Sequence, residues 1–459
     1  MGQARLKSDE TIGDRPEGGW TTLIDEIRGG DWTDPKTGER APPAQNEAIV
    51  IAEDLDGAEP ELIARLGMTG ALAVVADRDT WDALGGRIAR NLAAAGSGAG
   101  VGAEAVVLDR PHADLRAVED LKSRLAGYDG VVAVGSGTVN DLCKYATFQD
   151  GRRYCVFGTA ASMDGYTSTT ASMTLDSGLK ISLPAQAAAG VFLDLRVSAA
   201  APGFLAAAGF GDCLCRSVAQ IDWWMSHRLL GTFYSDAPYR ISDRDEAETN
   251  RRAAKIGASD LGAIGYLNRS LVLSGLGVGF TGVSNHGSMG EHQISHYIDC
   301  FAGERHPGTL HGQQVGVATL TMARIQHWFL AQERPPRLRP TRIDPDDMAR
   351  RMGPEVAAQC AAEYRKKALD EAGAERLYAG LCEIWPELRR ECRAFALPVA
   401  EMRDMLAAAG GPVSAAELGL PVDFYREAVR HGHEMRNRFS FADLACDAGL
   451  LDDFAAAEA

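Results

Sequence analysis

The sequence lacks an excess of basic residues. Its 63 Asp and Glu residues outnumber 47 Lys and Arg residues, which gives a formal net charge of -16. Because nothing offsets the repulsion between such a chain and phosphate groups, we expect no nucleic-acid partner. An anionic small molecule would have to be bound locally, by a helix N-terminus, an arginine or a cation.

Long apolar runs and an ordered set of cysteines are also absent. The longest apolar runs fall well short of the roughly 20 residues that span a bilayer. The first stretch, MGQARLKSDETIGDRPEGGW, has no apolar core of a secretory signal. The nine cysteines are scattered and odd in number, which argues against a disulfide framework. We therefore expect a reduced, cytoplasmic protein that has no membrane segment.

The 459 residues suffice for two or three domains. We interpret the polar residues 1–46 as a loosely packed extension. Between 47 and 200, Val-rich runs alternate with helical patterns, which predicts a Rossmann-like, doubly wound parallel sheet. The predicted strands are AIVIAED (48–54), ALAVVADRD (71–79), AEAVVLDR (103–110), GVVAVGSG (130–137) and YCVFGTA (154–160). Residues 201–459 show helical patterns and are predicted to form an all-helical domain.

Two segments follow predicted strands and could contact a ligand. In 135-GSGTVND-141, Gly135 and Gly137 allow a close backbone approach to a pyrophosphate at a helix N-terminus, although a plain tight turn explains them equally well. The stretch 158-GTAASMDGYTSTTASM-173 surrounds Asp164 with hydroxyl residues that could bind a nicotinamide, ribose or polyol. A solvated Ser/Thr loop is the alternative.

Histidines are concentrated between residues 286 and 327. In 290-GEHQISHYID-299, His292 and His296 share one helical face, and His311 follows in HGQQVG. Such residues could bind a metal, transfer a proton or fill a helix face. Asp212, in GFGDCLCRS, is the best candidate for a further ligand. We interpret Cys213 and Cys215 as packed thiols, because a lone C-x-C pair is a poor zinc motif.

Asp77 ends the predicted strand ALAVVAD and is followed by Arg78. An acid at this place can bind both ribose hydroxyls of NAD and repel the 2′-phosphate of NADP, which the arginine would partly offset. We therefore expect a modest preference for NADH. The alternative is that Asp77 only starts the next turn.

The order of these motifs resembles the sn-glycerol-1-phosphate dehydrogenase family, especially its bacterial branch associated with arabinose operons. GSGTVND, TAASMDGYTS, GFGD, EHQISH and HG-x-x-VG carry the resemblance, which covers roughly residues 48 to 400. That family belongs to the group that contains glycerol dehydrogenase, iron-containing alcohol dehydrogenases and dehydroquinate synthase. The resemblance implies a dehydroquinate synthase-like fold, with the active site in the cleft between an α/β domain and a helical metal-binding domain.

The resemblance also implies specific roles for residues. Asp212, His292 and His311 are implied as ligands of one divalent metal, and Asp164 and His296 as substrate or proton-handling residues. The implied NAD or NADP contacts, besides Gly135 and Asp77 above, are Gly137, Thr138, Val139, Asn140, Asp141, Thr159, Ser162 and Ser168. Zinc, nickel and iron can all use one carboxylate and two imidazoles, so the metal is left open.

The expected function is therefore metal-dependent, NAD(P)-linked interconversion of dihydroxyacetone phosphate and sn-glycerol 1-phosphate. The substrate class is a phosphorylated triose or polyol, and we expect a homo-oligomer, a dimer or larger. A dehydrogenase of another polyol and a dehydroquinate synthase-like cyclase are the alternatives. Asp212 argues against the cyclase, in which this ligand is typically Glu. A catalytically silent scaffold is disfavoured because every expected ligand type is present.

Overall fold

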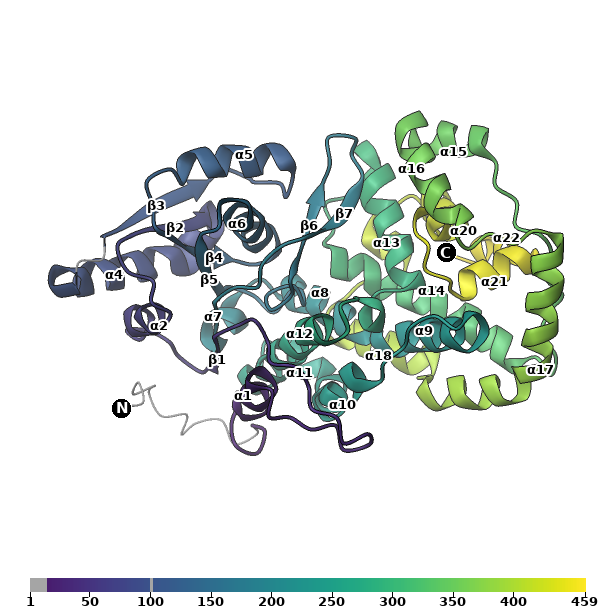
Figure 1. Ribbon diagram of the computed structural model, residues 1–459, viewed down its shortest axis with the longest axis horizontal. Helices are drawn as coiled ribbons and strands as arrows, with labels where there is room; N and C mark the ends of the chain where they lie inside the picture. The colour runs from purple at the N-terminus through teal and green to yellow at the C-terminus, as the bar shows by residue number, and fades with distance from the viewer. Residues whose placement is uncertain (1–14, 100–101) are drawn as a thin grey trace. The chain divides into compact units, whose positions relative to one another are not determined.

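The computed structural model describes residues 15–99 and 102–459 (Figure 1). The chain forms two compact units whose segments interleave along the sequence. The first comprises the described residues up to Asp176, together with Lys180–Gly209 and Ala237–Gly282. The second comprises Ser177–Leu179, Phe210–Asp236 and Val283–Ala459. The predicted domain boundaries after residues 46 and 200 stay a prediction.

A six-stranded sheet forms the centre of the first unit. Its order is β1-β8-β5-β4-β2-β3, and all neighbouring strands are parallel. The strands are β1 (Ala48–Ala52), β2 (Ala71–Asp77), β3 (Gly102–Leu108), β4 (Gly130–Gly135), β5 (Arg153–Gly158) and β8 (Gly190–Asp194). The predicted doubly wound parallel sheet is confirmed, and five of its strands overlap the five predicted runs. Sequence analysis missed β8.

Both faces of this sheet are covered by helices because its strands are apolar on both sides. Val131 and Ala133 of β4 belong to one buried cluster, and Val132 and Val134 to the other. Figure 1 shows α5 (Leu115–Arg124) and α6 (Gly137–Asp150) over one face, and α2 (Glu59–Arg65) and α4 (Gly86–Ala99) over the other. This continuous burial is typical of parallel strands.

The strand order changes direction between β2 and β4. From β2 the chain proceeds to the edge strand β3, whereas from β4 it proceeds to β5 and β8 on the other side. In open α/β sheets, ligands bind beyond the carboxyl ends of strands at such a switch point. Asp77 ends β2 and Gly135 ends β4, so two of the predicted cofactor positions lie at this point.

A two-stranded antiparallel hairpin follows the main sheet. It consists of β6 (Thr170–Thr174) and β7 (Lys180–Pro184), paired from Thr170 with Pro184 to Thr174 with Lys180. The predicted Ser/Thr loop 158–173 is therefore a loop only in its first part. Its last residues form β6 because Ala171 and Met173 alternate inward.

Part of the N-terminal arm is packed, whereas residues 35–45 are exposed or half-buried, and its interpretation as a loosely packed extension stays a prediction. Trp20 is 2% exposed and lies against Gly265 of α12 (Leu261–Thr281). Arg269 of α12 donates to the backbone oxygens of Gly19 and Trp20, each at 3.1 Å. The remaining helices of this unit include α1 (Thr22–Gly29), α7 (Leu195–Ala200), α10 (Ala237–Arg251) and α11 (Ala253–Gly257). Residues 1–14 lie outside the described residues.

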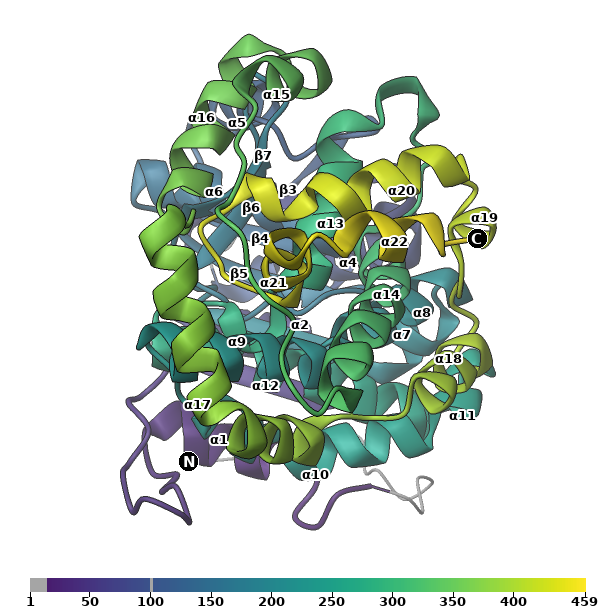
Figure 2. The same ribbon diagram turned by 90° about the vertical axis from the view of Figure 1, so that its right-hand side faces the viewer.

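The second unit is built from helices, and residues 201–459 contain no strand, as predicted. Figure 2 faces this unit. Its helices are α8 (Gly203–Leu214, which begins in the first unit), α9 (Arg216–Leu230), α13 (Gly290–Phe301), α14 (His311–Ala331), α15 (Pro345–Met352), α16 (Pro354–Arg365), α17 (Glu371–Phe395), α18 (Val399–Ala408), α19 (Ala415–Leu418), α20 (Val422–His431), α21 (Phe441–Ala448) and α22 (Leu451–Ala456). Among the described residues, no helix combines the length and apolar character needed to cross a membrane.

Candidate metal and cofactor sites

Three helices of the second unit bring together the residues predicted to bind a metal. Asp212 comes from α8, His292 from α13 and His311 from the start of α14. One potential ligand atom from each lies within 4.8 Å of the others, and all three side chains are half-buried. One carboxylate and two imidazoles are a donor set that divalent transition metals accept, and they leave coordination positions for substrate.

A close approach of two helices places Asp212 near His311. A Cβ atom on Gly211 would lie only 2.1 Å from the backbone oxygen of Gly312, so α8 and α14 can come this close only with glycine there. Each glycine is adjacent in sequence to a predicted ligand. The glycines of GFGD and HGQQVG therefore have a packing role that brings the two ligands together.

Hydrogen bonds orient both imidazoles. The Nδ1 of His292 lies 2.9 Å from Oε1 of Glu291, which also accepts from the backbone nitrogen of Met289 at 2.7 Å. Because a carboxylate only accepts, Nδ1 carries the proton and Nε2 offers its lone pair. The Nδ1 of His311 lies 2.8 Å from Oγ of Ser295 and 3.7 Å from Oδ2 of Asp299. Such partners are typical of metal-binding histidines.

A second set of donors, Cys215, Glu291 and His292, is equally compact but suits a metal less well. The Cys215 thiol donates to the backbone oxygens of Asp212 and Gly287, at 3.1 and 3.4 Å. The Oε1 atom of Glu291 already accepts two hydrogen bonds. Oε2 of Glu291 is buried without a hydrogen-bond partner among the described residues, but the Cys215 contacts use a protonated thiol, so the Asp212 set is the better fit.

His296 lies beside the two histidines without belonging to either compact set. Its ring centroid is 6.2 Å from that of His292 and 5.2 Å from that of His311. Arg436 donates from Nη2 to Nε2 of His296 over 3.1 Å. Since arginine only donates, Nε2 is the unprotonated nitrogen of a neutral His296, and the proton is on Nδ1. Sequence analysis did not identify Arg436.

The predicted phosphate turn lies in the first unit, at the switch point of the sheet. Gly135 ends β4, and α6 begins at Gly137. A Cβ on Gly135 would meet Val139 at 2.7 Å, whereas on Gly137 it would meet only Met163, at 3.8 Å. Gly135 is therefore required for packing, and Gly137 leaves the N-terminus of α6 accessible to a ligand. Thr138, Val139, Asn140 and Asp141 form the first turn of this helix.

Asp141 and Ser168 belong to a buried polar cluster around Lys144. The Nζ of Lys144 donates to the backbone oxygens of Gly165 and Thr170 and to Oγ of Ser168, at 2.6, 3.0 and 3.1 Å. Oδ2 of Asp141 accepts from the backbone nitrogen of Ser172 at 3.1 Å. Burial raises the pKa of Asp141, while nearby Lys144 opposes this shift. This cluster holds the loop after β5 against α6.

The other predicted residues of this loop lie at its beginning and middle. The backbone nitrogen of Thr159 donates to the backbone oxygen of Gly135 at 3.2 Å, so the loop starts beside the glycine turn. Thr159 and Ser162 are buried. Oδ2 of Asp164 accepts from Oγ of Ser274 at 2.9 Å. Asp164 is thereby tied to α12 within the first unit.

Asp77 caps a short helix, α3 (Arg78–Thr80). Its Oδ1 accepts from the backbone nitrogen and from Oγ1 of Thr80, at 2.8 and 2.9 Å. Arg78 pairs with Asp109 at 3.1 Å, and both side chains are exposed. Asp77 thus begins the next turn, as the alternative held, and in addition caps it; a contact to the cofactor ribose stays a prediction.

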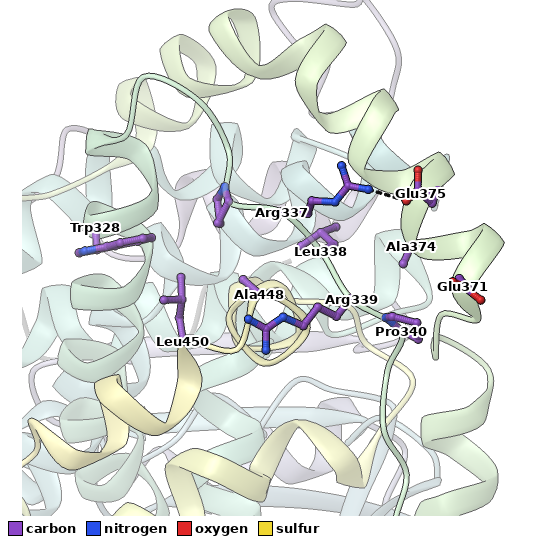
Figure 3. A pocket seen from close by; sticks show the side chains of 11 residues that line it. Trp328, Arg337, Leu338, Arg339, Pro340, Glu371, Ala374, Glu375, Ala448 and Leu450 are labelled. Carbon is purple, nitrogen blue, oxygen red and sulfur yellow. Dashed lines mark hydrogen bonds and ion pairs between the residues drawn. The ribbon is translucent and has the colours of Figure 1, made fainter.

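A surface cavity of about 520 Å³ lies elsewhere in the second unit. Figure 3 shows the side chains that line it, with Arg337 paired to Glu375 and the Arg339 side chain extending away from Pro340. None of the predicted metal or catalytic residues lines this cavity. It therefore plays no part in the site proposed below.

Comparison with known proteins first gives the class. A family model described as iron-containing alcohol dehydrogenase matches residues 50–202. A probable glycerol dehydrogenase from Sinorhizobium meliloti shares the fold with a TM-score of 0.59 and 19% identity, over 90% of this chain and 98% of that one. Glycerol dehydrogenase from Schizosaccharomyces pombe does so with a TM-score of 0.60 and 17% identity, over 90% of each chain. The fold is that of the iron-containing alcohol dehydrogenase class.

Relatives in sequence give the family. Glycerol-1-phosphate dehydrogenase (NAD(P)+) of Bacillus subtilis is 32% identical over 314 residues, which are 68% of each chain. The enzyme of the same name from Bacillus velezensis is 29% identical over 415 residues, 88% of this chain and 92% of the relative. The chain belongs to the glycerol-1-phosphate dehydrogenase family. The family resemblance seen in the sequence motifs is thus confirmed.

Proposed function

We propose that this chain is a metal-dependent oxidoreductase that interconverts dihydroxyacetone phosphate and sn-glycerol 1-phosphate with NAD(H) or NADP(H). The observation that carries the proposal is the meeting of Asp212, His292 and His311 in a member of the glycerol-1-phosphate dehydrogenase family. The names of the relatives supply the substrate and the cofactor.

In this proposal, Asp212 and the Nε2 atoms of His292 and His311 hold one Zn²⁺, Ni²⁺ or Fe²⁺ ion. Such an ion supplies Lewis-acid stabilisation of negative charge on the substrate oxygen. Glu291 and Ser295 keep the two imidazoles in the orientation and protonation state that ligation needs. The buried surroundings of Glu291 limit the access of water to this part of the site.

The reaction itself is a balanced transfer of a hydride and a proton. The carbonyl carbon of dihydroxyacetone phosphate accepts the hydride of the reduced nicotinamide, and its oxygen accepts a proton. We assign Nδ1 of His296 to donate a hydrogen bond to this oxygen, because Nε2 is engaged by Arg436, and the proton itself comes from water. Asp164 is assigned to binding a substrate hydroxyl, for which its carboxylate is a suitable acceptor.

The cofactor is assigned to the switch point of the sheet in the first unit. Gly137 and the first turn of α6 would receive the pyrophosphate, since exposed backbone nitrogens and the helix dipole favour negative charge there. Thr159 and Ser162 follow from the loop after β5, and Asp77 from the end of β2. A homo-oligomer and a cytoplasmic location stay predictions.

The test is a substrate and cofactor screen on protein reconstituted with each of the three metals. Dihydroxyacetone phosphate, dihydroxyacetone and sugar ketones are each offered with NADH and with NADPH. We expect the highest kcat/KM with dihydroxyacetone phosphate, and a product that is the sn-1 enantiomer by chiral analysis. A higher kcat/KM with an unphosphorylated ketone would make the chain a polyol dehydrogenase instead.

A further inference from the structure

Two arginines follow the short helix η4 (Gly432–Met435) and lie close to the histidine cluster. Arg436 donates to His296, as described above. Arg438 donates from Nη1 to the backbone oxygen of Ser288 and, at 2.9 Å, to its Oγ; Nη2 donates to Oγ of Ser284 at 2.9 Å. Both arginines are half-buried. One guanidinium therefore contacts His296, and a second, two residues further along the chain, contacts two serine hydroxyls.

Within the part of the chain that the structure describes, neither guanidinium has a carboxylate partner, in contrast to Arg87, Arg269 and Arg351. Within the described residues, no ion pair joins Arg436 or Arg438 to an acid, and the side chain to which Arg436 donates is that of His296. Arg87 pairs with Glu59 and Asp194, Arg269 with Asp245, and Arg351 with Asp347 and Glu434. The positive charge beside His296 is thus not neutralised by direct contact.

Bringing the two arginines together is unfavourable in the absence of an anion. Burial and the repulsion from Arg436 lower the pKa of Arg438 to about 9, and Glu291 only partly opposes this shift. With a pKa of about 9, Arg438 still carries its charge at neutral pH. An anion between the two arginines would relieve this repulsion. The chain has 63 Asp and Glu residues, yet no ion pair of the described residues places one of them on either arginine.

The backbone between the arginines and α21 is held in place before any ligand arrives. The carbonyl oxygen of Arg438 accepts from Nε2 of Gln293 at 3.0 Å and from Nζ of Lys367 at 2.8 Å. Gln293 is adjacent to His292 on α13. Three residues after Arg438, the backbone nitrogen of Phe441 donates to Oδ1 of Asp222 at 3.0 Å. The arginines are therefore fixed to the helix that carries a predicted metal ligand, an arrangement that favours binding by preorganisation.

We propose that Arg436 and Arg438, with the hydroxyls of Ser284 and Ser288, bind the phosphate of the substrate. The inference rests on the proposed function and identifies the residues that select a phosphorylated triose or polyol. Arginine offers several donors in a planar fork that matches phosphate oxygens. Only a methylene carbon and an ester oxygen separate the carbonyl carbon of such a triose from its phosphorus. A phosphate site next to His296, itself beside His311, satisfies this short spacing.

The test compares Arg436→Gln and Arg438→Gln with a matched control. Arg430→Gln removes an arginine of nearby α20 that pairs with Asp452 at 3.0 Å and has no contact with the cluster. For each protein, kcat/KM is measured with dihydroxyacetone phosphate and with dihydroxyacetone, and glycerol 1-phosphate binding is measured by calorimetry without cofactor. We expect the ratio of the two kcat/KM values, and the affinity for glycerol 1-phosphate, to fall at least about tenfold in both test variants. The control should match the wild type.

Each other result has a defined meaning. An unchanged ratio overturns the assignment, and so does a rise confined to the KM for NADPH, which would assign the arginines to the cofactor phosphate. Failure of the wild type to prefer dihydroxyacetone phosphate refutes the proposed function itself, before any variant is made. Arg436→Lys keeps the positive charge but loses the planar guanidinium. Its ratio of kcat/KM for dihydroxyacetone phosphate to kcat/KM for dihydroxyacetone should lie between those of Arg436→Gln and the wild type. If Arg436→Gln does not fold, the Lys variant is compared with the wild type in its place.

Discussion

At the scale of single residues, the neighbours of the predicted ligands decide which donor set a metal can use. Glu291 holds the proton of His292 on Nδ1, and the Cys215 thiol is turned to two backbone oxygens. Both residues also belong to the second compact set of donors. The distinction between a ligand and a residue that orients a ligand is therefore testable at these two positions.

We expect Cys215→Ser to keep one bound metal ion per chain, because Cys215 is not a ligand in our assignment. Glu291→Gln should weaken metal affinity by roughly 10- to 100-fold, since it removes the acceptor that fixes His292. Metal content by mass spectrometry and affinity by competition with a chelating dye measure both effects. Loss of the metal from Cys215→Ser would instead favour the second donor set.

Asp77 has two possible roles, a helix cap and a contact to the cofactor ribose. Asp77→Ser should keep the cap, because serine is also a good N-cap residue. It should raise kcat/KM with NADPH relative to NADH by about three- to tenfold, since the charge that repels the 2′-phosphate is gone. Asp79→Ser, at an exposed position of the same turn, is the control. Equal cofactor ratios in Asp77→Ser and wild type would leave Asp77 with the cap alone.

At the scale of elements, the contact between α8 and α14 positions two of the three predicted ligands. This contact depends on Gly211, where any side chain would collide with the backbone of Gly312. Because backbone atoms cannot move aside as a flexible side chain can, the helices would have to separate. Asp212 and His311, next to these glycines, would move with them.

Gly211→Ala should lower the free energy of unfolding by roughly 1–3 kcal/mol and weaken metal binding, because the two ligands are displaced. Gly203→Ala provides the control on the same helix, since a Cβ there meets nothing within 4 Å. Denaturant unfolding and metal titration of both variants make the comparison. Equal stability of the two variants would show that the close contact is not needed to position the ligands.

Several elements were predictable because their signals are local. Val-rich runs between helical patterns predicted the parallel sheet, and the strand-to-helix position of GSGTVND was right. The β6–β7 hairpin was missed because Ser and Thr make up most of β6 and obscure the alternation of Ala171 and Met173. Arg436 and Arg438 could not be recognised from sequence, since the groups they contact, from Ser284 to His296, lie about 140 to 154 residues earlier in the chain.

At the scale of the whole molecule, the second unit buries titratable groups whose pKa values link the free energy of unfolding to pH. His433 is 2% exposed, and Oη of Tyr364 lies 3.0 Å from its Nε2. Burial lowers the pKa of His433 to about 3; Glu434 opposes this shift and Lys367 reinforces it. In the unfolded chain the pKa is near 6.5. Below that pH the unfolded state binds a proton that the folded state does not.

His433 should therefore contribute a loss of stability as the pH falls from about 6.5 toward 3, by up to roughly 1.4 kcal/mol per pH unit, whereas the raised pKa values of buried Asp222 and Asp447 act in the opposite direction. His433→Gln should reduce this slope, and His112→Gln, at an exposed position, should not. Urea unfolding at pH 7.5, 6.0 and 5.0 gives the slopes. Parallel curves for His433→Gln and wild type would contradict the buried neutral state of His433.

The most direct test of the account measures bound metal and turnover in the same samples. Metal-free protein is titrated with Zn²⁺, Ni²⁺ or Fe²⁺ while the reduction of dihydroxyacetone phosphate by NADH is followed, for the wild type, Asp212→Ala and His311→Ala. The account predicts that wild-type turnover rises with added metal and stops rising at one ion per chain. Asp212→Ala and His311→Ala should fold, bind no ion tightly and turn over at least about 100-fold more slowly than the wild type. Full turnover of metal-free wild type, or stoichiometric metal with full turnover in Asp212→Ala, would contradict it.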